Sequence, residues 1–271
     1  MTIELPAGIA DDEEVEELTS SPSPARTYLT ATLTLMALIG AWEICARWAN
    51  LPAWLLPSPS AIADAVADWR WELLQHFLVT FSETLLGFGL AIVVSIPLAV
   101  AIVYSPILQM TIYPILLALQ SMPKVAIAPL FALWIGFGMM PKILVVFLVS
   151  FFPIIVATER GLTSVPPPLM ELIRSLSASP LQTFIKIRFP TAMPQIFTGF
   201  KIAITLSVIG AVIGEFVGAQ SGLGYLILLA SSQSRTPLAF GALLCLTVMS
   251  ILLYYAVELI ERLVVPWAKK T

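Results

Sequence analysis

The sequence is poor in charged residues. Only 11% of its 271 residues are Asp, Glu, Lys or Arg, whereas about 25% is usual for a soluble domain. Hydrophobic residues make up 58% of the chain, and the mean hydropathy is +0.92. This composition excludes an ordinary soluble domain and predicts an all-α integral membrane protein.

Residues that carry catalysis or bind nucleotides are also scarce. The chain has one histidine and two cysteines, Cys45 and Cys245, each within an apolar run. No Cys/His ligand spacing is present, so we predict no metal site and no catalytic residue. No glycine precedes a lysine, which excludes the GxxxxGK[ST] loop that cradles phosphates. The sequence has no basic patch of the kind that binds nucleic acid.

The acidic residues are concentrated at the start of the chain. The first seventeen positions contain seven of the 17 acids, and the segment lacks hydrophobic periodicity. We interpret residues 1–25 as a disordered acidic tail and residues 26–271 as a transmembrane domain.

Long apolar runs predict six membrane spans. A spanning helix needs about 20 mostly apolar residues, and the expected spans are about 27–48, 77–104, a proline-broken third span from 107 to the GFGMMPK turn, 141–158, 194–217 and 237–264.

Basic residues in the short loops predict the orientation. With both ends of the chain inside, nine Lys and Arg residues fall on the cytoplasmic side and four on the outer side. The outer four are Arg47, Arg70, Lys142 and Arg235. The excess on one side predicts cytoplasmic termini, and the loop at 160–193 then also faces the cytoplasm.

That loop carries two amphipathic helical patterns. Apolar residues at 169, 172, 173 and 176 form one stripe. Ser179 and Gln182 suggest a capping box for a second short helix, which we expect to end at Phe189-Pro190. Two uses remain open for such helices, namely lying on the inner leaflet or docking in a partner's groove.

The same loop resembles the EAA loop of ABC importer permeases. Glu171-Leu172-Ile173 stands at the Glu-Ala-Ala position, Ser177 at the family's glycine, and Ile187 to Pro190 at the Ile-x-Leu-Pro position. Further likeness extends over about 42–267, as in LPSPSAI, SMPKVAIAPLFALWIGFG, SGLGYLI and ERLVVPW, particularly to the nitrate/sulfonate/taurine-type branch.

The resemblance implies a type I permease fold whose cytoplasmic coupling helices dock on an ATPase. The residues that it assigns to coupling are Glu171, Leu172, Ile173, Arg174, Leu176, Ser177, Ile187 and Pro190. It further implies a homodimer in the bacterial cytoplasmic (inner) membrane, in contact with lipid. A separate cytoplasmic ATPase dimer would bind ATP and Mg, and a periplasmic or lipid-anchored binding protein would deliver the solute. The chain itself would bind no cofactor.

Some residues within the spans are candidates for a translocation pathway. Gln120, Ser121 and Lys124 surround the break in the third span, and Glu215 lies near the end of the fifth. Ionisable residues at membrane depth usually face a bundle interior or water; alternatively, Lys124 extends to an interface and Glu215 is a structural acid.

The glycines Gly210, Gly214 and Gly218 recur every four residues, which permits close helix packing within the chain or at a dimer seam.

The permease branch that the chain resembles handles small anions and also vitamin precursors, so both substrate classes stay open. A secondary transporter or channel uncoupled from ATP is the alternative function.

Overall fold

The computed structural model describes residues 24–48, 52 and 54–267, and its regular elements are all helices. In chain order these are α2 Pro24–Trp48, α3 Pro59–Asp68, α4 Arg70–Tyr104, α5 Pro106–Gln120, α6 Lys124–Ile135, α7 Met139–Thr163, α8 Pro167–Ser175, α9 Pro180–Thr183, the π-helical turn η1 Phe184–Arg188, α10 Phe189–Phe216, α11 Leu223–Ser232 and α12 Thr236–Val264. The predicted acidic tail falls almost wholly outside the described residues.

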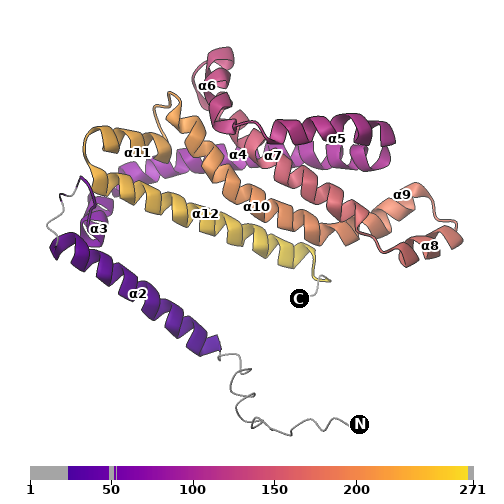
Figure 1. Cartoon of the computed structure of the whole chain (residues 1–271), viewed down its shortest axis with the longest axis horizontal. Helices are drawn as coiled ribbons and strands as arrows, with labels where there is room; N and C mark the ends of the chain where they lie inside the picture. Colours follow the sequence, from indigo (N-terminus) through magenta and orange to yellow (C-terminus); the bar gives the residue numbers. More distant parts are fainter. Residues whose placement is uncertain (1–23, 49–51, 53, 268–271) are drawn as a thin grey trace, which may run out of the picture.

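Helix α7 lies at the centre of the bundle, between α4 and α10 (Figure 1). Glycines allow this close approach. A Cβ atom at Gly210 would lie 3.0 Å from the Cα atom of Val146, and one at Gly214 would lie 3.0 Å from the Cα atom of Lys142. Gly87 of α4 abuts Val146 from the other side. The helix interfaces are therefore built from small residues facing backbone, as in many membrane bundles.

Within the part of the chain that the structure describes, five helices are long and apolar enough to span a membrane, and α5 with α6 makes a sixth only as a bent pair. The two members of this pair meet at 97°, so the expected third span is not straight. The bend falls where Ser121, Met122 and Pro123 interrupt the helix. Proline has no N–H and disfavours helical geometry in the residue before it, which explains the break.

The expected helix end at Phe189-Pro190 is wrong. From Pro180 to Phe216 the chain runs through α9, η1 and α10 as one span of 37 residues. The N–H of Phe189 bonds to the carbonyl of Phe184 in the π-helical turn. A proline ring clashes with the carbonyl four residues earlier in a regular α-helix. The wider turn directly before Pro190 changes that geometry, and Pro190 is the second residue of α10.

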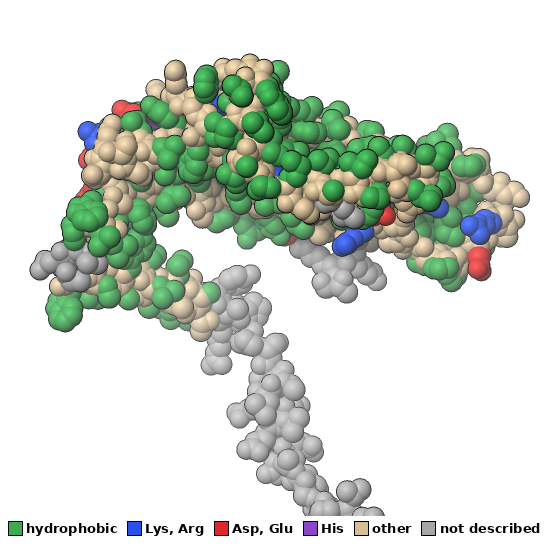
Figure 2. All heavy atoms as spheres, turned by 45° about the horizontal axis from the view of Figure 1, so that its top comes forward, with side chains coloured by type: hydrophobic (Ala, Val, Ile, Leu, Met, Phe, Trp, Pro, Cys, Tyr) green, Lys and Arg blue, Asp and Glu red, His purple; other side chains and the backbone are tan. Residues whose placement is uncertain are grey.

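The long helices separate two different ends of the molecule. Helices α8 and α9 form one end, while α3 and α11 lie at the other (Figure 1). Between them the visible surface is mostly hydrophobic (Figure 2). Helix α2 stands away from the bundle and meets α3, where the Glu43 carboxylate accepts hydrogen bonds from the Ser60 N–H, at 3.0 Å, and its hydroxyl, at 2.8 Å.

Candidate functional site: a terminal knob and a buried charged cluster

Helices α8 and α9 with the turn η1, residues 167–188, form a knob at one end of the bundle (Figure 1). On α8, Leu172 is 55% exposed and Leu176 is 71% exposed. Glu171 and Arg174 are exposed beside them, whereas Ile173 is buried. The apolar stripe that the sequence predicts is thus divided, with Ile173 turned inward and two leucines left uncovered by this chain.

The turn after α8 adopts a backbone geometry that favours glycine. Ser177 has φ of +52°, its N–H bonds to Arg174 O at 3.0 Å, and the Ala178 N–H bonds to Ile173 O at 3.4 Å. This pair of bonds is the Schellman motif, in which the left-handed residue is usually glycine. This geometry explains why the EAA loop has a glycine at the position that Ser177 occupies here.

The capping box that the sequence predicts for the second knob helix is confirmed. The Ser179 hydroxyl accepts from the Gln182 N–H at 3.2 Å, and the Gln182 side chain accepts from the Ser179 N–H at 3.0 Å. Together with the Schellman turn, it fixes α9 relative to α8 by local hydrogen bonds alone. The knob is a preorganised element.

Aromatic contacts attach the knob to the end of α4. The rings of Tyr104 and Phe184 lie 5.9 Å apart edge to face, and Phe184 lies 5.8 Å from Phe189. The Arg188 guanidinium sits 5.3 Å above the Tyr104 ring. Ile187 and Pro190 are partly buried, and Pro190 O accepts from the Trp267 indole N–H at 3.3 Å. Movement of the knob would therefore pull on α4 and on the chain after α12.

The predicted pathway residues fall at two separate places. Gln120 and Ser121 are exposed at the bend between α5 and α6. The Lys124 ammonium lies 5.3 Å from the Phe152 ring centre and donates to Gln120 O at 3.2 Å. Glu215, in contrast, is 1% exposed and near Lys142. Because Lys142 and Phe152 are ten residues apart on α7, roughly 15 Å of helix separates the two places.

Glu215 belongs to a buried charged cluster that the sequence analysis missed. Its carboxylate accepts from the Thr80 hydroxyl at 2.7 Å and from the Gly224 N–H at 2.5 Å. Nearby, the Lys142 ammonium pairs with the Glu83 carboxylate. Lys142, counted above among loop charges, in fact lies 7% exposed in the first turn of α7. Opposite charges inside two apolar spans were the available signal for this pair.

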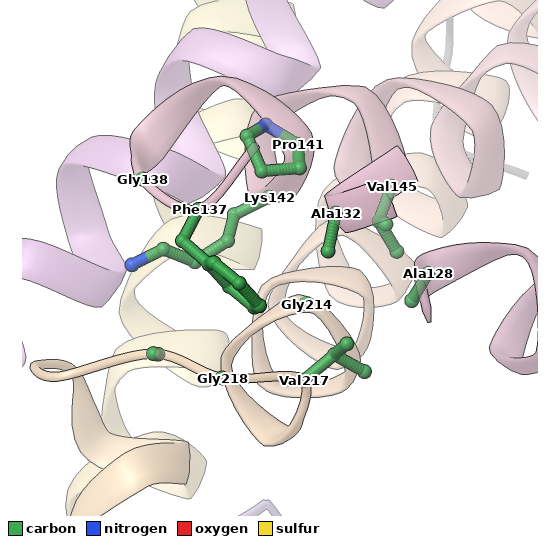
Figure 3. A pocket seen from close by; sticks show the side chains of 11 residues that line it. Ala128, Ala132, Phe137, Gly138, Pro141, Lys142, Val145, Gly214, Val217 and Gly218 are labelled. Carbon is green, nitrogen blue, oxygen red and sulfur yellow. The ribbon is translucent and has the colours of Figure 1, made fainter. Parts of the chain in front are cut away.

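Two cavities adjoin this cluster. The smaller, about 10 Å³, lies between α6, α7 and the end of α10, and in Figure 3 the Phe137 ring points toward Gly214 and Gly218 while the Lys142 amine points away. The larger cavity, about 740 Å³, is lined by Glu83 and Lys142 together with Ser82, Gln220 and Ser221. The ion pair therefore forms part of a cavity wall at the end opposite the knob.

A bundle of apolar spanning helices with a compact helical knob at one end is an architecture typical of membrane transport proteins. Comparison with known families agrees. Residues 91–270 match the family described as binding-protein-dependent transport system inner membrane component. The chain belongs to this family of ABC importer permeases, whose members are the non-catalytic membrane subunits of their transporters.

Several relatives show which permeases the chain is similar to. The formylaminopyrimidine transport permease protein ThiX of Halalkalibacterium halodurans is 36% identical over 90% of this chain and 99% of its own length. The riboflavin transport system permease protein RibX of Chloroflexus aurantiacus is 36% identical over 87% of this chain and 88% of its own. The putative aliphatic sulfonates transport permease protein SsuC of Bacillus subtilis is 28% identical over 96% of each.

A solved structure supports the fold. An inward-facing form of the MetNI methionine ABC transporter matches with a TM-score of 0.64, at 22% identity, over 73% of this chain and 98% of that chain. The type I importer fold implied by the EAA-like loop is therefore confirmed. So is the assignment of this chain as a permease rather than as an ATP-independent transporter.

Proposed function

We propose that this permease imports a small solute by docking its knob on a cytoplasmic ATPase. The observation that carries the proposal is the exposed apolar face of the knob, formed by Leu172, Leu176, Leu181 and Ile185. An apolar stripe flanked by charge is the surface of a helix that lies in a partner's groove. The local caps make it rigid, so it can transmit a displacement.

Docking explains the knob better than a position on the lipid surface does. A helix on the leaflet would turn its basic residues toward the headgroups. Of the three basic residues of the knob, Arg188 instead lies over the Tyr104 ring and Arg174 shares α8 with the exposed Glu171, while Lys186 is exposed. The EAA resemblance assigns eight residues to coupling, seven in the knob and Pro190 in α10. We expect the ATPase to act through these residues.

The remaining assembly follows from the same proposal. Two copies of the permease form one pathway surrounded by lipid, a dimer of ATPase subunits binds ATP and Mg, and a solute-binding protein meets the opposite end. Both termini and the knob face the cytoplasm, which the excess of Lys and Arg on that side supports. The cavity beside Glu83 and Lys142 then lies at the outer end.

For the solute, we propose a small molecule of the vitamin-precursor type, ahead of an anion of the nitrate, sulfonate or taurine type. The relatives named for formylaminopyrimidine and riboflavin share 36% of their residues with this chain, and the sulfonate relative shares 28%. Gln120, Ser121, Lys124 and Glu215 remain our candidates for residues along the pathway.

The docking proposal is tested by a charge placed on the knob. Leu172→Asp puts a carboxylate on the apolar face, and burying it against the ATPase without a partner would cost several kcal/mol, roughly a hundredfold or more in affinity. The full chain is co-expressed with the ATPase subunit of its transporter, and the amount of ATPase that co-purifies is measured.

A matched variant controls for the new charge. Leu55 has the same exposed fraction as Leu172, 55%, but lies before α3 at the opposite end. Leu55→Asp should leave the co-purified ATPase unchanged. Equal recovery of the ATPase with both variants, each folded as judged by gel filtration, would refute docking at the knob.

A further inference from the structure

The buried cluster near the end opposite the knob holds three ionisable groups. Glu83 and Glu215 are each 1% exposed and Lys142 is 7% exposed. Glu215 is bonded to Thr80, one turn from Glu83 on α4, and it follows Gly214, which abuts Lys142. If all three were ionised, the cluster would carry a net charge of −1. A buried charge without a counter-charge costs several kcal/mol, so a further positive charge is required.

The hydrogen bonds at the start of α11 favour Glu215 as the ionised acid. The first N–H groups of a helix have no partner within it. Gly222 N–H donates to His76 Nδ1 at 2.9 Å, Leu223 N–H to the Thr80 hydroxyl at 2.8 Å and Gly224 N–H to Glu215 Oε2 at 2.5 Å.

Thr80 then has one proton left to donate. Its hydroxyl is 2.7 Å from Glu215 Oε1 and 3.2 Å from His76 O, and we assign the proton to the shorter contact. With this assignment both Glu215 oxygens accept hydrogen bonds at a helix N-terminus, which is where a carboxylate is most favoured.

Glu83 has the opposite pattern. Its Oε1 accepts from the Lys142 ammonium, but its Oε2 is buried and has no hydrogen-bond partner. An ionised carboxylate oxygen buried without a donor is costly. A protonated one becomes a donor, and Glu215, which is bonded to Thr80 one turn before Glu83 on α4, offers a carboxylate as its acceptor. One proton on Glu83 thus satisfies the free oxygen and removes the excess negative charge.

We propose that Glu83, Lys142 and Glu215 form a proton-binding site, in which Glu83 holds the proton on Oε2 and donates a hydrogen bond to Glu215. The site is then electrically neutral, with Lys142 and Glu215 carrying the two charges. It joins α4, α7, α10 and the start of α11, and its proton keeps the wall of the 740 Å³ cavity free of net negative charge.

A proton fits this site better than a metal ion does. Among the residues that the structure describes, no three His, Cys, Asp or Glu side chains are grouped so as to hold a metal. The Lys142 ammonium already occupies one side of Glu83, and a second cation there would be repelled. Gly222 and Gly224 press against the Glu215 carboxylate, where even a Cβ atom would collide.

Infrared difference spectra of the purified full chain test the assignment. A protonated carboxyl group has a carbonyl band that an ionised one lacks. Wild type minus Glu83→Gln should show the loss of one such band. Wild type minus Glu215→Gln should show the same loss, because Glu83 and Lys142 then balance each other and Glu83 ionises. The glutamine at 83 is expected to fold, because its carbonyl can accept from Lys142 and its amide can donate to Glu215 as the protonated acid does.

Thermal unfolding gives a second readout. Glu83→Gln should unfold within about 2 °C of wild type. Glu215→Gln should unfold roughly 5–10 °C lower, because its amide would face the Gly224 N–H and the Thr80 hydroxyl, which are both donors. Retention of the carbonyl band in either variant, a Glu215→Gln chain as stable as wild type, or a Glu83→Gln chain that does not fold would each overturn the proposal.

Discussion

Thr80 offers a sharp test of how the end opposite the knob is held together. Its hydroxyl accepts from the Leu223 N–H at 2.8 Å and donates to Glu215 Oε1 at 2.7 Å. Thr80→Val keeps the shape of the side chain and removes both bonds. Leu223 is fully buried, so water cannot replace the lost acceptor. An unsatisfied buried N–H costs about 1–3 kcal/mol, and a bond to a charged group is worth about 1.5–3 kcal/mol.

The expected loss of stability is therefore about 3–5 kcal/mol, or roughly 6–15 °C in Tm. Thr84 provides the control, because it lies one turn further along α4 and is equally buried. Its hydroxyl donates at 2.7 Å to Thr80 O, a carbonyl that already accepts within the helix. Thr84→Val should cost less than about 1 kcal/mol.

Unfolding of the purified full chain in detergent, followed by tryptophan fluorescence, measures both variants. If Thr80→Val unfolds within about 2 °C of Thr84→Val, the hydrogen bonds of Thr80 contribute little. The cluster would then not hold α11 against α4 and α10.

Two further predictions concern backbone geometry. Gly210→Ala should destabilise the chain by about 1–3 kcal/mol, because its Cβ atom would meet the Val146 backbone at 3.0 Å. Gly89→Ala, where nothing lies within 4 Å, should instead gain up to about 1 kcal/mol, and comparing the two Tm values checks the helix packing. Ser177→Gly should relieve the left-handed backbone strain at φ +52°, which stabilises the knob locally by about 1 kcal/mol. Proteolysis of the knob should then slow by up to several-fold, and faster cleavage would contradict this reasoning.

The sequence predicts those parts of the fold that depend on local physics. Apolar runs locate the spanning helices, because a backbone in lipid must form its hydrogen bonds internally. Ser179 and Gln182 predict the cap that the structure shows, since a capping box involves only residues three apart. The two knob helices follow from periodicity in the same way, although the second continues into α10.

Other features depend on contacts between distant segments. The pair of Glu83 with Lys142 joins residues 59 positions apart, and no spacing rule links them. Glu215 could be recognised as an ionisable residue within a span, but its partners Thr80 and Gly224 follow only from how α11 folds back on α4. The π-helical turn before Pro190 is a local deviation that ordinary helix patterns do not include.

The central claim is that the bundle is driven through its knob by a separate ATPase. The most direct measurement is solute uptake by proteoliposomes that contain the full chain together with the ATPase and the binding protein of its transporter. We predict uptake against a gradient only with ATP, and its loss with Leu172→Asp but not with Leu55→Asp. Uphill uptake by the permease alone, without any nucleotide-hydrolysing partner, would contradict the claim.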